Sequence, residues 1–108
     1  MGLDMYAFSA PADAYDKEVD FIINDEFCTE VAYWRKHYAL HGWMENLYKE
    51  KGSTEEFNCT NLNLTIDDIK QLENDLAKWP LPEQDLKFIN DAKYVLLSGN
   101  KLYYTSWW

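Results

Sequence analysis

Two histidines, His37 and His41, are the residues of this sequence best suited to acid–base or metal chemistry. Imidazole titrates near neutral pH, and two imidazoles four positions apart on a helix can share a metal ion. Glu45 lies four positions beyond His41, and Glu30 precedes both histidines. The sequence therefore predicts His41, Glu30 and Glu45 as candidate catalytic residues, and His37 and His41 as candidate metal ligands. Zinc takes at least three protein ligands, so a packing role for both histidines is the alternative, and no cofactor is expected.

The two cysteines, Cys28 and Cys59, are too far apart for a Cys-x-x-Cys redox or zinc motif. No secretory signal opens the chain, so both are expected to be reduced thiols. A nucleophilic pairing with His41 would require the fold to bring the groups together. Burial of both thiols is the alternative, because free cysteine is among the most buried residue types.

Acidic residues are concentrated in two blocks of the 108-residue chain, whose net charge is -9. Residues 1–30 contain eight acids and one base, and residues 52–85 contain eight acids and two bases. The segments between and after them are mildly basic. Nucleic acid is not an expected partner, because binding a polyanion relies on Lys and Arg neutralising phosphates. A solvated surface explains such charge, and the alternative is an acidic face that docks on a basic partner by imitating nucleic acid.

Aromatic residues are more numerous than a core of this size needs, with five Trp, eight Tyr and five Phe. Some of them are therefore expected at the surface, where aromatic side chains mark contact patches. Trp107 and Trp108 at the end of the chain are candidates for a stacking surface. The predicted binding face consists of Tyr33, Trp34, Arg35, Lys36, His41 and Tyr48.

These residues need elements to position them, and the strongest pattern predicts a helix over residues 29–51. Thr29 is a plausible N-cap, and Gly52 is placed to end the helix. An apolar stripe of Tyr33, Leu40, Met44 and Leu47, widened by Trp43, is expected to face the core. The spacing then predicts one helix flank that carries Glu30, Trp34, His37, His41, Glu45 and Tyr48.

The remaining pattern predicts a strand over residues 3–8, a loop over 11–29, with or without a short turn or helix in it, and a strand over 57–64. Leu3, Met5 and Ala7 alternate with Asp4, Tyr6 and Phe8 in the first strand. Thr65 and Asp68 form a capping box for a second helix, whose apolar set is Ile66, Ile69, Leu72, Leu76 and Trp79. A third helix over residues 83–98 is expected to bury Leu86, Ile89, Ala92, Val95 and Leu96.

Together these elements predict a single compact α+β domain over residues 1–108, with about three short strands and about three helices packed on one face of the sheet. Residues 101–108 are expected to form an edge strand or the arm of a hairpin, and they are a candidate homodimer contact. No apolar run approaches the roughly 18 residues of a membrane span, so no membrane partner is expected.

Two motifs stand out at the start of the chain and before its strongest helical pattern. Residues 2–6 read Gly-Leu-Asp-Met-Tyr, and residues 30–36 read Glu-Val-Ala-Tyr-Trp-Arg-Lys, followed by His41-Gly-Trp43. Together they resemble a family of small uncharacterised phage and prophage proteins. Asn58-Cys59 matches the Asn-Cys pair that begins the family's next strand. The resemblance implies a phage accessory protein acting in the host cytoplasm, and it supplies no known activity.

Three hypotheses for function remain open. The first is a non-enzymatic phage accessory protein that binds a host or phage protein, because the chain is acidic, has surplus aromatic residues and shows no recognisable catalytic set. The second is a small enzyme or ligand-binding domain with a site around Glu30, Trp34, Arg35 and His41, where His41 acts as base. The third is an acidic nucleic-acid mimic.

Overall fold

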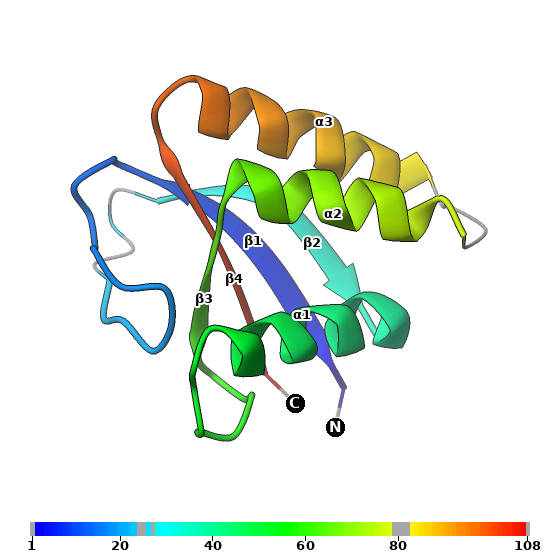
Figure 1. Ribbon diagram of the computed structural model, residues 1–108, viewed down its shortest axis with the longest axis horizontal. Helices are drawn as coiled ribbons and strands as arrows, with labels where there is room; N and C mark the ends of the chain where they lie inside the picture. The colour runs from blue at the N-terminus through cyan, green and yellow to red at the C-terminus, as the bar shows by residue number, and fades with distance from the viewer. Residues whose placement is uncertain (1, 24–25, 27, 79–82, 108) are drawn as a thin grey trace.

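The computed structural model describes residues 2–23, 26, 28–78 and 83–107. Four antiparallel strands form one sheet in the order β2-β1-β4-β3, and three helices lie together on one side of it (Figure 1). The elements are β1 (Asp4–Ala10), β2 (Thr29–Arg35), α1 (Tyr38–Glu50), β3 (Asn61–Leu64), α2 (Ile66–Leu76), α3 (Glu83–Leu97) and β4 (Lys101–Trp107). The predicted α+β class is confirmed, and the sheet has one strand more than expected.

Residues 29–35 form strand β2, so the helix predicted over residues 29–51 is wrong in its first third. The segment pairs with β1 in an antiparallel register that sets Trp34 opposite Met5, and both side chains are buried. Lys36 then adopts a left-handed backbone with φ 57°, which separates β2 from α1. Because the helix begins only at Tyr38, the predicted helix flank from Glu30 to Tyr48 does not exist.

Strand β4 is central, so the predicted position of the C-terminal strand at a sheet edge is wrong. It pairs with β1 along one side and with β3 along the other. Leu102 and Tyr104 are fully buried beneath the helices. A central position in the sheet allows both side chains to be buried. Its backbone groups are used within the chain, and the outer strands of the sheet are β2 and β3. A homodimer contact through an unpaired β4 edge is therefore not available.

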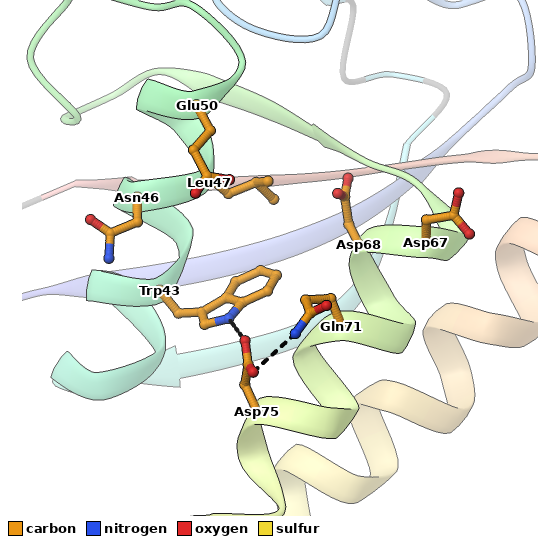
Figure 2. A pocket seen from close by; sticks show the side chains of 8 residues that line it. All are labelled: Trp43, Asn46, Leu47, Glu50, Asp67, Asp68, Gln71 and Asp75. Atoms are coloured by element: carbon orange, nitrogen blue, oxygen red, sulfur yellow. Dashed lines mark hydrogen bonds between the residues drawn. The ribbon is translucent and has the colours of Figure 1, made fainter.

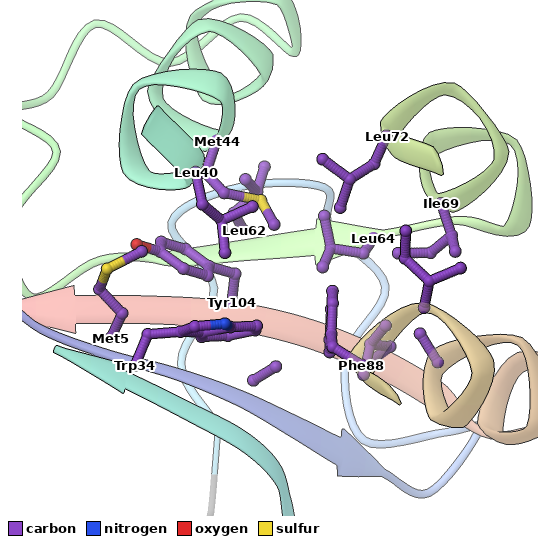
Figure 3. Packing of buried hydrophobic residues seen from close by; sticks show 14 of the residues in the cluster. Met5, Trp34, Leu40, Met44, Leu62, Leu64, Ile69, Leu72, Phe88 and Tyr104 are labelled. Carbon is purple, nitrogen blue, oxygen red and sulfur yellow. The ribbon is translucent and has the colours of Figure 1, made fainter. Parts of the chain in front are cut away.

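The main core lies between the sheet and the three helices (Figure 3). Met5 and Ala7 are buried there, which confirms the predicted alternation in the first strand. Helix α1 buries Leu40, Met44 and Tyr48 against the same face. None of the three helices in the described part of the chain has both the length and the apolar character of a membrane span.

Helices α2 and α3 follow the predicted positions closely. The backbone N–H of Asp68 donates to Thr65 Oγ1 at 3.2 Å and the backbone N–H of Thr65 donates to Asp68 Oδ2 at 2.9 Å, so the predicted capping box is present. Ile69, Leu72 and Leu76 are buried as expected, whereas Trp79 lies outside the described residues. The predicted burial of Leu86 is wrong: its side chain is 46% exposed, because α3 turns Asp85, Phe88, Ile89 and Ala92 inward instead.

The described part of the segment before β2, residues 11–23, 26 and 28, is irregular, as predicted, and its residues Tyr15 and Phe21 cover part of the sheet face that lies away from the helices. Tyr15 stacks on Phe21 with ring centroids 3.7 Å apart, and both rings meet Tyr103 edge-on. The same segment follows the outer side of β3, where Asp20 N–H donates to the carbonyl of Asn61 at 3.0 Å. β3 itself begins at Asn61, later than the predicted strand, after Cys59 adopts a left-handed φ of 60°.

Candidate binding surfaces

The residues predicted to form one binding face are distributed over different parts of the structure. Trp34 is 3% exposed and Tyr48 is fully buried, so both belong to the core and the prediction that they contact a partner is wrong. Their burial follows from the strand assignment of β2 and from the core-facing side of α1. Tyr33 and Arg35 lie on the opposite face of the sheet from the helices, and Lys36 is exposed directly after β2.

His37 is partly buried and belongs to a polar cluster around the buried Asp85 of α3, which also contacts Trp34 of β2. Its Nε2 atom lies 2.8 Å from Oδ2 of Asp85, and the indole Nε1 of Trp34 donates to Oδ1 of the same carboxylate at 3.0 Å. Asp85 is 2% exposed and stands in the first turn of α3, where the helix dipole favours a carboxylate. A buried carboxylate requires such partners, so the geometry gives His37 a structural role.

His41 has a different partner from His37. Its Nδ1 atom lies 2.8 Å from the Tyr104 hydroxyl oxygen, and its ring is 5.0 Å from that of Phe57. Burial lowers the pKa of His41, while the charge of Glu45 on the same helix acts in the opposite direction. Burial also raises the pKa of the Tyr104 hydroxyl.

The remaining candidates for catalysis and metal binding do not form a metal site in the described structure. Glu30 is exposed in β2, opposite Phe8 of β1. Across the residues that the structure describes, no group of three or more His, Cys, Asp or Glu is placed to hold a metal ion. The predicted pair of His37 and His41 therefore has no third ligand there.

The sheet face away from the helices carries a continuous group of aromatic rings. Strand register sets Tyr6 of β1 opposite Tyr33 of β2, and sets Asp4 opposite both Arg35 of β2 and Trp107 of β4. The Tyr6 ring centroid is 5.0 Å from that of Tyr33 and 4.9 Å from that of Trp107. We call Tyr6, Phe8, Tyr33 and Trp107 the aromatic face.

Much of the aromatic face is open to solvent. Tyr33 is 38% exposed and Trp107 is 45% exposed, in contrast to Tyr103, which is buried against Tyr15 and Phe21. The Tyr33 hydroxyl donates to Asp4 Oδ1 at 2.7 Å, and this hydrogen bond raises the pKa of Tyr33. Alternation in the sequence places Tyr6 and Phe8 together, but it misses Tyr33 as their neighbour because the helical pattern over residues 29–35 competes with it.

A groove of about 580 Å³ separates α1 from α2 on the helical side (Figure 2). The indole Nε1 of Trp43 donates to Asp75 Oδ2 at 2.8 Å, and the Gln71 side chain donates to Asp75 Oδ1 at 3.0 Å. These bonds lower the pKa of Asp75, with the indole contributing most. The groove is lined by Trp43, Asn46, Leu47, Glu50, Asp67, Asp68, Gln71 and Asp75. The sequence pattern misses it because its walls come from two separate helices, and because helical spacing places Trp43 in the core stripe.

Comparison with known proteins gave no match to a protein-family model, to a curated protein or to a solved structure.

Proposed function

We propose that this protein acts by binding another protein through the aromatic face. The observation that carries the proposal is the contact between Tyr6, Tyr33 and Trp107 across three strands, on the part of the sheet face where Tyr33 and Trp107 are exposed. Tyrosine and tryptophan supply much of the binding energy of protein interfaces, because each removes a large area from water while it orders few torsions. A cluster of such rings at the surface is typical of a contact patch.

The charges around the aromatic face favour a protein over a nucleic acid as the partner. Aromatic sheets that stack nucleobases combine their rings with a positively charged groove that follows the phosphates. Here Arg35 stands beside Asp4 on the face, in a chain with a net charge of -9. The resemblance to phage and prophage proteins extends the proposal to a host or phage protein met in the host cytoplasm.

Affinity capture with two matched double variants tests the proposal. Tyr33→Ala with Trp107→Ala removes two rings from the aromatic face, whereas Tyr38→Ala with Tyr94→Ala removes two rings that are 66% and 76% exposed on helices. From a lysate of infected bacteria, we expect the helix variant to retain the same protein as the unmodified chain and the face variant to lose it. Equal retention by the two variants would reject the aromatic face as the contact.

A further inference from the structure

The α1–α2 groove has an unbalanced charge. Its lining includes the carboxylates of Glu50, Asp67, Asp68 and Asp75, with no lysine or arginine among the described lining residues. Lys51 lies beside the groove and pairs with Asp68 at 2.7 Å. Glu50, Asp67 and Asp75 take part in no ion pair within the described part of the chain. Asp75 already accepts hydrogen bonds from Trp43 and Gln71 and feels the charge of Lys78, which lies outside the groove lining. A cationic group entering the groove would therefore meet Glu50 and Asp67, which have no ion-pair partner among the described residues, and Asp75 already oriented by its hydrogen bonds.

Trp43 gives the groove an aromatic wall. Figure 2 shows its indole between the two helices, with the ring nitrogen directed at Asp75. The hydrogen bond to Asp75 fixes the ring, and the partial exposure of Trp43 leaves part of the indole accessible. Indole is the side chain that binds cations most strongly over its ring face. The indole ring of Trp43 attracts a cation through its ring face, and the carboxylates attract a cation through their charge.

We propose that this groove binds a basic peptide segment, with an arginine side chain placed against Trp43. A planar guanidinium can stack on the indole while its N–H groups donate to carboxylates, which a compact ammonium does less well. The volume of about 580 Å³ lies within the usual range for ligand pockets. The net charge of -9 attracts a basic segment from a distance. This proposal is independent of the aromatic face, which lies on the other side of the sheet.

Titration with acetyl-Arg-Arg-Arg-amide, followed by NMR and calorimetry, tests the groove. We expect a saturable shift of the Trp43 indole N–H signal, identified from its absence in Trp43→Phe, and weaker binding of acetyl-Lys-Lys-Lys-amide. The double variant Glu50→Gln, Asp67→Asn should weaken tri-arginine binding about tenfold, because two carboxylate charges of the groove lining are removed.

A charge-matched control separates groove binding from general attraction to an acidic protein. Glu56→Gln with Glu83→Gln removes the same charge at exposed positions outside the groove lining. We expect this control to change the affinity less than about threefold, because exposed charges at a distance are screened by salt. Equal weakening by the two double variants would overturn the proposal, as would a Trp43 indole signal that does not move. Circular dichroism of each variant confirms that the fold is retained. Neither outcome depends on the protein partner of the aromatic face.

Discussion

The indole of Trp34 in β2 donates a 3.0 Å hydrogen bond to the buried carboxylate of Asp85 in α3. This bond joins an outer strand of the sheet to a helix that follows it by about half the chain. His37 Nε2 lies 2.8 Å from the second oxygen of the same carboxylate. Trp34 also packs edge-on against Phe88, at a centroid distance of 4.8 Å. Trp34, which the sequence suggested for binding, and His37, which it suggested for metal chemistry, therefore stabilise the packing of α3 against the sheet.

Replacing Asp85 should destabilise the protein strongly. Asp85→Ala leaves the buried indole N–H of Trp34 without its acceptor and removes the partner of His37, at a cost of about 2–4 kcal/mol in the free energy of unfolding. Urea denaturation measures this change. Asp91→Ala, which removes an acid from the same helix and breaks the exposed pair with Lys87, should cost less than about 1 kcal/mol. Equal effects of the two substitutions would contradict the structural role of Asp85.

Stability should depend on pH through His41. Burial lowers its pKa in the folded state, so the unfolded chain binds the proton more readily. The free energy of unfolding should therefore be highest above the ordinary histidine pKa of about 6.5 and should fall as the pH decreases toward the lower folded-state value.

Proton NMR of the His41 ring gives the folded-state pKa directly, and chemical denaturation between pH 5 and 8 gives the stability. In His41→Gln, the part of the pH dependence that belongs to this residue should disappear. A pKa of His41 at or above the ordinary value would contradict the prediction.

Lys51 should contribute more to stability than the exposed Lys87. Its ammonium donates to Asp68 at 2.7 Å, to Glu18 at 2.8 Å and to the carbonyl of Asn63 at 2.6 Å, and its side chain is 13% exposed. Lys51→Met would leave these acceptors without their shared donor, and should lower the unfolding free energy by about 1–3 kcal/mol. In Lys87→Met, where the side chain is 75% exposed, the change should stay within about 0.5 kcal/mol by thermal or urea unfolding. If Lys51→Met lowers the unfolding free energy no more than Lys87→Met does, the stabilising role of the Lys51 hydrogen bonds is contradicted.

Local features of the fold could be predicted from the sequence. The capping box of Thr65 and Asp68 depends on residues three apart, and the alternation in β1 is visible within seven residues. Helical spacing likewise predicted Leu40 and Met44 in the core. These features could be predicted because each depends on residues within a few positions of one another.

Features that depend on distant partners could not be predicted in the same way. Tyr33, Trp34 and Arg35 fit a helical pattern as well as an alternating one. They form a strand because Trp34 pairs with Met5 of β1 and donates to Asp85 of α3, and neither partner is near it in the sequence. Strand β4 becomes central because β1 and β3 pair on either side of it. The aromatic face and the α1–α2 groove each combine residues far apart in sequence, so both surfaces emerge only in three dimensions.

The central claim, that the aromatic face contacts a protein partner, is tested most directly by photo-cross-linking. Benzoylphenylalanine in place of Tyr33 puts a photoreactive ring on the aromatic face, and the same replacement of Tyr94 puts it on the exposed side of α3. On irradiation in infected cells, we predict a discrete protein adduct from position 33 and none of that mass from position 94. An adduct of the same mass from both positions, or from position 94 alone, would contradict the account.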